Sequence, residues 1–142
     1  YKIIYNNSGR PSINSNLNIS ISHSNEIAAI VFSTKKRIGI DIQLNENKII
    51  NIQKKFLNVS EKPKIGQFTS VNLLTMLWTS KESIYKAIGK KGISFSKNII
   101  IDKVCEKEKN SFGYYINGSE KIKFNLSFFY LDNYTICYAY ED

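Results

Sequence analysis

The segment from residue 70 to Gly89 constrains the fold most, because it carries a long helical pattern between strand-like segments. Thr69 or Ser70 is placed to cap the start of a helix, and Gly89 is placed to end it. Apolar side chains recur at helical spacing along one side of it: Val71, Leu74, Leu77, Trp78, Ile84, Ala87 and Ile88. A helix of this kind must bury that side, so the sequence predicts an α+β fold in which it packs against strands.

The same helix places Trp78, Glu82 and Lys86 one above another, because they are spaced four residues apart. This pattern has an ordinary explanation when it stands alone. A Glu followed by a Lys at this spacing is a common surface pair worth about 0.2–0.5 kcal/mol, and a Trp one turn earlier is usually part of a core. The triplet therefore becomes a candidate site only if other segments point to the same chemistry.

Strand patterns lie on both sides of the helix. Short runs of β-branched and aromatic residues are typical of strands, and Asn, Gly and Asp between them are typical of turns. Before the helix, the predicted elements are strands at 1–5, 17–24, 27–33 and 38–43, a turn at 6–12, a modest helix at 47–57 and a loop at 58–68. After it, strands are predicted at 99–104, 112–116, 121–130 and 134–140, with hairpin turns at Asn117-Gly118 and Asp132-Asn133.

The strand at 17–24 alternates apolar and polar residues, which predicts a half-buried strand with its apolar face on the core. We expect its hairpin partner at 27–33 to be more deeply buried. His23 lies at the end of the first strand, between Ser22 and Ser24. Hydroxyl and imidazole N–H groups donate to phosphate oxygens, so these residues form either an anion-binding cluster or an ordinary surface.

Asp41 is the most unusual residue of the predicted strands, because it lies in the middle of the apolar run 38–43. A buried carboxylate without a partner costs roughly several kcal/mol. Asp41 therefore requires a Lys, an Arg or a metal ion beside it. Gly39 lies on the same face and leaves room for a ligand or for another backbone to approach.

Length and charge narrow the classes of partner. The 142 residues suffice for one domain or two small lobes, and the net charge of +8 indicates an anionic partner: nucleic acid, a phosphorylated metabolite, an acidic protein or a membrane.

Cys105 and Cys137 without CxxC spacing, together with a single His, exclude a Cys/His zinc site and fit a cytoplasmic protein. We find no membrane span or signal peptide. Because the chain begins at Tyr1 and its only Met is Met76, we expect an upstream segment that was removed or belongs to another chain.

Four short motifs occur in a specific order: Gly9-Arg10-Pro11, Ser22-His23-Ser24, Gly39 to Gln43, and Trp78 to Gly89. Over about residues 9–95 this order resembles the surfactin-synthetase-activating type of 4′-phosphopantetheinyl transferase. The resemblance implies a pseudo-dimer of two α+β lobes with coenzyme A between them. Residues 1–38 would be the remnant of a truncated first lobe, and residues 39–142 would be the second lobe.

The resemblance also implies an activity. The 4′-phosphopantetheine arm of coenzyme A would move, in a Mg²⁺-dependent reaction, to a serine of an apo acyl or peptidyl carrier protein, and adenosine 3′,5′-bisphosphate would be released. Whether that carrier serves fatty-acid, polyketide or nonribosomal peptide synthesis stays open. By resemblance, Asp41 and Glu82 would hold the metal, and Glu82 would also help take the serine proton. Lys86 would neutralise the leaving phosphate. Ser22 and His23 would bind phosphates, and Arg10 and Pro11 would lie beside the adenine and a phosphate.

The chain departs from the family pattern at Gln43, where the family usually has Glu. Gln is a poorer Mg²⁺ ligand, so its place at the metal, direct or through a water, stays open. This departure and the short first lobe leave a second interpretation, a non-catalytic coenzyme A-binding or degenerate module. The oligomeric state, monomer or dimer, also stays open.

A third interpretation is a basic RNA-binding domain with aromatic strands. We expect no nucleic-acid or membrane partner, because no RNP-type motif occurs and the aromatic residues alternate as core residues do. Four lysines either dock an acidic carrier or are ordinary solvated surface: Lys62, Lys64, Lys90 and Lys91.

Overall fold

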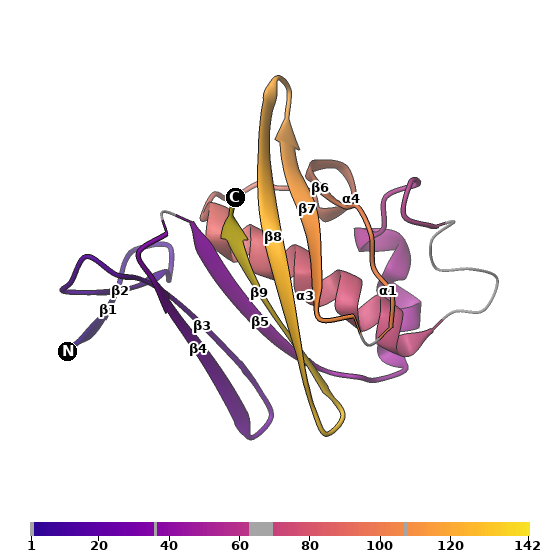
Figure 1. Ribbon diagram of the computed structural model, residues 1–142, viewed down its shortest axis with the longest axis horizontal. Helices are drawn as coiled ribbons and strands as arrows, with labels where there is room; N and C mark the ends of the chain where they lie inside the picture. The colour runs from indigo at the N-terminus through magenta and orange to yellow at the C-terminus, as the bar shows by residue number, and fades with distance from the viewer. Residues whose placement is uncertain (1, 36, 63–69, 107) are drawn as a thin grey trace.

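The computed structural model describes residues 2–35, 37–62, 70–106 and 108–142, and within these ranges a long helix packs against a five-stranded antiparallel sheet (Figure 1). The sheet order is β5-β9-β8-β7-β6. Its strands are β5 (Ile38–Leu44), β6 (Ile99–Ile101), β7 (Asn110–Asn117), β8 (Glu120–Leu131) and β9 (Tyr134–Glu141). The helices are α1 (Lys48–Phe56), α3 (Val71–Ile88) and α4 (Phe95–Asn98), and two separate hairpins are formed by β1 (Ile3–Tyr5) with β2 (Pro11–Ile13) and by β3 (Asn18–Ser24) with β4 (Ile27–Ser33).

Helix α3 has the ends that the sequence predicts. The Ser70 side chain accepts a hydrogen bond from the backbone N–H of Leu73, and Gly89 ends the helix in the left-handed region at φ 67°. Thr69, the other candidate cap, lies outside the described residues. The apolar side of α3 forms the core with the sheet, and Leu74, Ile84 and the strand residues packed on them are almost completely buried. The α+β prediction is confirmed.

Gly39 determines how closely β5 approaches α3. A Cβ atom at Gly39 would lie 2.0 Å from the backbone oxygen of Ser83 and 2.8 Å from the backbone nitrogen of Ala87. The room that Gly39 leaves is therefore used by another backbone, as one of the two alternatives predicted. Because side chains alternate along a strand, Asp41 points to the same side of β5 as Gly39, toward the helix.

The β3–β4 hairpin packs on the free edge of β5 through the polar face of β3. Ile19 on the apolar face is buried as predicted, at 3% exposed, but the serine face is buried as well, which was not predicted. Ser20 and Ser22 are only 5% and 6% exposed. Their hydroxyls accept hydrogen bonds from the backbone N–H groups of Ile40, at 3.0 Å, and Ile42, at 3.2 Å. An edge strand has N–H groups without partners in its own sheet, and short hydroxyl side chains of β3 satisfy two of them.

Strand β4 is less buried than β3, so the prediction of a more deeply buried strand was wrong. Its residues alternate between half-buried and exposed, and Ile30 and Phe32 are 46% and 49% exposed. The hairpin itself is confirmed, with Asn18 opposite Ser33 and Ser24 opposite Ile27. Among the described residues, the face of β4 that carries Ile30 and Phe32 is therefore largely open to solvent.

Smaller differences lie at the ends of elements. The predicted turn at 6–12 is shorter, because Pro11 already pairs with Tyr5 in the β1–β2 hairpin. The strand predicted at 99–104 ends at Ile101, and the four-residue helix α4 before it was not predicted. Residues 63–69, with Lys64 and most of the predicted loop, lie outside the described residues. None of the described helices has the length and apolarity that crossing a membrane requires.

Candidate functional site

The buried carboxylate of Asp41 has the cation that its position requires. Asp41 is 3% exposed, and its Oδ1 lies 2.9 Å from the Nζ of Lys86 on α3. The same Nζ donates to the backbone oxygen of Ile40 at 3.0 Å. The prediction of a cationic partner for Asp41 is confirmed, and the Lys86–Asp41 pair joins β5 to α3.

Two further side chains donate to the Asp41 carboxylate. The hydroxyl of Ser22 donates to Oδ1 at 3.0 Å, and the Nε2 of Gln43 donates to Oδ2 at 3.1 Å. Donors from β3, β5 and α3 thus converge on one carboxylate. Three donors, one of them charged, hydrogen-bond to the carboxylate and fix the orientation of both oxygens.

Glu82 lies in the same electrostatic environment as Asp41. Burial and, to a smaller extent, the negative charge of Asp41 raise the pKa of Glu82 from 4.5 to about 7, against the opposing effect of Lys86. Two acidic side chains therefore share one cationic side chain. The two negative charges exceed the one positive charge, and a bound cation would balance that excess.

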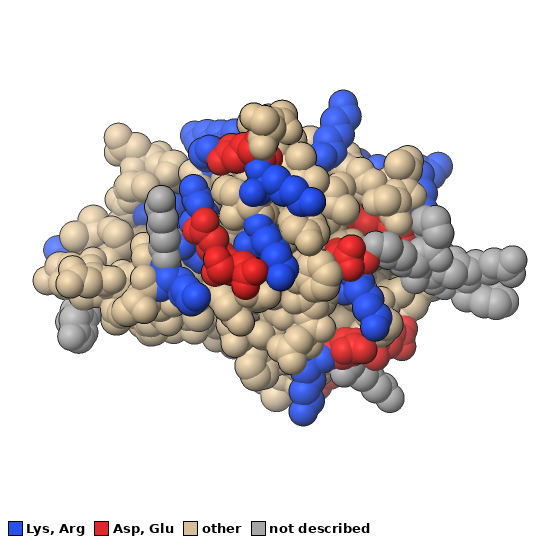
Figure 2. Space-filling model, turned by 45° about the horizontal axis from the view of Figure 1, so that its top comes forward, with Lys and Arg blue, Asp and Glu red and all other residues tan. Residues whose placement is uncertain are grey.

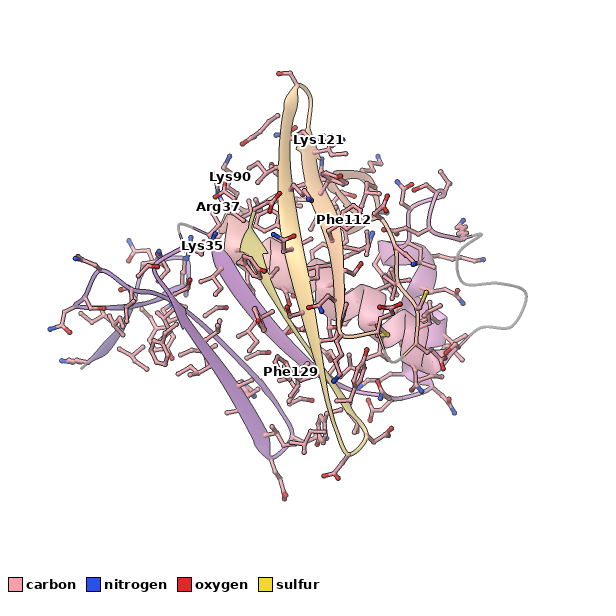
Figure 3. All side chains as sticks on the ribbon, in the orientation of Figure 1. Lys35, Arg37, Lys90, Phe112, Lys121 and Phe129 are labelled. Carbon is pink, nitrogen blue, oxygen red and sulfur yellow. The ribbon has the colours of Figure 1, made fainter. Side chains whose placement is uncertain are left out.

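A pocket of about 200 Å³ lies at the C-terminal end of α3, between that end and the turn before β2. Its lining includes Arg10, Pro11, Ser20, Lys86, Lys90 and Lys91. Four of these side chains are cationic, so the pocket is suited to phosphate groups. Figure 3 shows Lys90 beside the C-terminal end of α3.

Gly89 allows the two walls of this pocket to meet. A Cβ atom at Gly89 would lie 2.4 Å from Nη1 of Arg10. The guanidinium therefore lies directly over the end of the helix, where the last carbonyl groups carry partial negative charge. This contact brings the Gly-Arg-Pro turn and the Trp78 to Gly89 motif into one site, as the sequence motifs suggested.

His23 lies apart from the other predicted site residues. It is exposed, and it is not one of the described residues that line the pocket. As the neighbour of Ser22 in a strand, it points to the opposite face of the β3–β4 hairpin. Its role as a phosphate ligand stays a prediction.

The comparisons with known proteins agree with this arrangement of motifs. A model of the 4′-phosphopantetheinyl transferase superfamily matches residues 37–139, most of the chain. The chain belongs to this superfamily. It is 34% identical over 88 residues to "4′-phosphopantetheinyl transferase gsp" of Aneurinibacillus migulanus, a match that covers 60% of this chain and 37% of that protein.

A solved structure supports the fold. The chain matches the crystal structure of Thermotoga maritima holo-[acyl-carrier-protein] synthase with a TM-score of 0.52 and 15% sequence identity. The match covers 76% of this chain and 64% of that one. At this identity the likeness concerns the fold alone. The chain thus spans less than two thirds of the length of both relatives.

Lys81, which stands in the superfamily motif, has a structural role here. It is fully buried, and its Nζ lies 2.8 Å from Oε2 of Glu61 and donates to the backbone oxygens of Phe95 and Ile99. Desolvation lowers the pKa of Lys81, and Glu61 opposes that effect. Glu61 also accepts from the backbone N–H groups of Asn58 and Ile101. This buried pair joins α3 to the segment after α1 and was not predicted.

The donor set fits a magnesium ion better than a transition metal. Among the described residues, no cluster of three or more His, Cys, Asp or Glu side chains is arranged to hold a metal ion. Magnesium, however, is often bound by one or two carboxylates together with substrate phosphates. Asp41, Glu82 and the adjacent cationic pocket provide that combination of groups.

Charges on the neighbouring surface are mixed. Figure 2 shows acidic side chains interspersed with basic ones. Salt bridges join Lys90 to Glu120, Arg37 to Glu141, and Lys123 to Asp142. Such pairing lowers the net positive field and does not favour the RNA-binding interpretation. Of the cationic side chains that line the pocket, Lys86 pairs with Asp41 and Lys90 with Glu120.

Proposed function

We propose that this chain transfers the 4′-phosphopantetheine arm of coenzyme A to a serine of an apo acyl or peptidyl carrier protein, in a Mg²⁺-dependent reaction. The observation that carries the proposal is the position of Lys86. Its ammonium group pairs with Asp41 and also lines the cationic pocket. A phosphate-binding pocket and a pair of carboxylates are therefore adjacent, as a reaction at a diphosphate requires.

The pocket would hold the phosphate and adenine portion of coenzyme A. Arg10 and Lys86 supply charge-assisted donors, and Pro11 supplies an apolar surface for the adenine. A volume of about 200 Å³ is below the range of about 300–1,000 Å³ for sites that enclose a small ligand. Coenzyme A would thus extend beyond the pocket, with its pantetheine arm directed away from it.

The chemistry follows from the residues around Lys86. The carrier serine oxygen attacks the phosphorus that bears pantetheine, and the bond from that phosphorus to the bridging oxygen breaks. Glu82 accepts the serine proton, directly or through a water. Lys86 neutralises the charge that develops on the bridging oxygen, which leaves on adenosine 3′,5′-bisphosphate. Magnesium held by Asp41 and Glu82 would supply charge neutralisation for the diphosphate.

A transfer assay tests the proposal. The chain is incubated with coenzyme A, Mg²⁺ and apo carriers from fatty-acid, polyketide and peptide synthesis, and mass spectrometry detects addition of one phosphopantetheine group. Asp41→Asn, Glu82→Gln and Lys86→Met should each abolish the addition, while Lys54→Met, at an exposed position of α1, should retain it. No added mass on any of these carriers would overturn the proposal.

The Gln43 side chain favours one second candidate, a coenzyme A-binding module without turnover. Its amide donates to Asp41 where the superfamily pattern usually has a third carboxylate. Under this alternative, calorimetry would detect coenzyme A binding although the transfer assay finds no product.

A further inference from the structure

We propose that Ser22 is a positioning residue for Asp41 and does not bind a phosphate of coenzyme A. The proposal rests on the proposed function, because it concerns how Asp41 is prepared for a cation and a diphosphate. It differs from the role that the family resemblance implies for Ser22.

The hydroxyl of Ser22 already uses its one proton. It accepts a hydrogen bond from the backbone N–H of Ile42 at 3.2 Å and donates one to Oδ1 of Asp41 at 3.0 Å. A hydroxyl group has one proton to donate. With that proton on Asp41, Ser22 has no donor left for a phosphate oxygen.

Lys86 cannot hold Asp41 in place throughout a reaction. Its side chain is 28% exposed, lines the cationic pocket and reaches the same Oδ1 that Ser22 contacts. A phosphate in the pocket competes with Asp41 for this ammonium group. When Lys86 turns toward the phosphate, Ser22 remains as the short, buried donor that keeps Oδ1 in place.

Gln43 completes this arrangement from the other side. Its amide donates to Oδ2 at 3.1 Å, so a cation that approaches Oδ2 replaces or shifts Gln43 while Ser22 keeps its bond to Oδ1. The carboxylate thus has one fixed oxygen and one oxygen available for exchange. Groups that orient a metal ligand in this way commonly contribute about 10–100-fold to metal affinity.

Ser20 provides a matched control. It lies two residues before Ser22 on the same face of β3, is similarly buried, and accepts the equivalent hydrogen bond from the backbone N–H of Ile40 at 3.0 Å. Its hydroxyl makes no hydrogen bond to Asp41 among the bonds of the described residues. Ser20→Ala therefore removes the same contact between β3 and β5 without removing a donor from the carboxylate.

Calorimetric titration of coenzyme A at increasing Mg²⁺ concentrations tests this role with Ser22→Ala, Ser22→Thr and Ser20→Ala. We expect Ser22→Ala to raise the Mg²⁺ concentration for half-maximal coenzyme A binding about tenfold. Ser22→Thr, which keeps a hydroxyl, should restore it to within about twofold. Ser20 lines the coenzyme A pocket, so Ser20→Ala is expected to change coenzyme A affinity by the same factor at every Mg²⁺ concentration and to leave the Mg²⁺ dependence itself unshifted. Ser22→Ala should lower the urea midpoint more than Ser20→Ala, because it also removes a donor from the buried carboxylate.

Two results would overturn the proposal. Equal Mg²⁺ dependence of the two alanine variants would make Ser22 only a contact between β3 and β5. Weaker coenzyme A binding by Ser22→Ala at every Mg²⁺ concentration, including none, would make Ser22 a phosphate ligand.

A ligand-free readout separates this test from the proposed function. Crystal structures of Ser22→Ala and Ser20→Ala should show the Asp41 carboxylate rotated in the first variant alone. An unrotated carboxylate in Ser22→Ala would refute the positioning role. If the unmodified chain binds coenzyme A but transfers nothing, the proposed transfer activity is refuted. The calorimetric titrations and the crystal structures then still decide the role of Ser22. If it binds no coenzyme A, the crystal structures alone decide.

Discussion

Replacing Glu82 with Gln should stabilise the ligand-free protein at neutral and alkaline pH. The pKa of Glu82 is raised from 4.5 to about 7 by burial and by the charge of Asp41. The native state therefore favours the protonated form, and the stability that this form contributes is fully present below pH 4.5 and is lost as the pH rises through 7. Gln keeps the shape of the protonated acid and does not titrate.

The expected size follows from the pKa difference. At about 1.36 kcal/mol for each pH unit, the ionised carboxylate costs up to about 3 kcal/mol above pH 8 and about 1 kcal/mol at pH 5. The advantage of Glu82→Gln over the unmodified protein should therefore grow by about 2–3 kcal/mol between pH 5 and pH 8.

Urea denaturation at four pH values, with EDTA present, measures this difference. Glu26→Gln, at an exposed position of the β3–β4 turn, is the matched control against which the pH dependence of Glu82→Gln is measured. A constant difference for Glu82→Gln over the same pH range would refute the conclusion that Glu82 is partly buried beside a second negative charge.

Three further substitutions test how the site is supported. Lys81→Met leaves Glu61 buried without its cation and should cost about 3–5 kcal/mol in urea denaturation; a loss below about 1 kcal/mol would contradict the buried pair. Gly39→Ala places a methyl group 2.0 Å from the backbone oxygen of Ser83 and should abolish cooperative thermal unfolding by circular dichroism, whereas a normal melting curve would be evidence against this packing. Gly89→Ala should cost about 1–2 kcal/mol because of its left-handed φ, and should weaken coenzyme A binding in calorimetry; unchanged binding would argue against the pocket at the end of α3.

Local signals in the sequence predicted much of the fold. The caps of α3 at Ser70 and Gly89 and the turn between β8 and β9 are determined by short-range backbone preferences, and each occurs where it was expected. The need for a cation beside Asp41 was also predictable, because an isolated buried carboxylate is costly wherever the chain brings it. Lys86 was one of several possible partners until the packing of β5 on α3 was known.

Contacts between distant segments were harder to predict. Alternation in β3 indicated an apolar buried face, and Ile19 is buried, but the free N–H groups of β5 also bury the serine face. The Lys81–Glu61 pair joins residues whose individual sequence contexts indicate an exposed helix position and a loop. Neither result follows from local propensity, because each depends on which backbone groups remain unsatisfied after the sheet and helix have packed.

The most direct test of the account is whether Mg²⁺ and coenzyme A bind together at Asp41. Calorimetric titration of coenzyme A should show that Mg²⁺ raises the affinity of the unmodified chain by about tenfold or more, a change of about 1.4 kcal/mol. Asp41→Asn should show no such increase. Equal affinities with and without Mg²⁺, or an undiminished increase in Asp41→Asn, would contradict a site built from the carboxylates of β5 and α3.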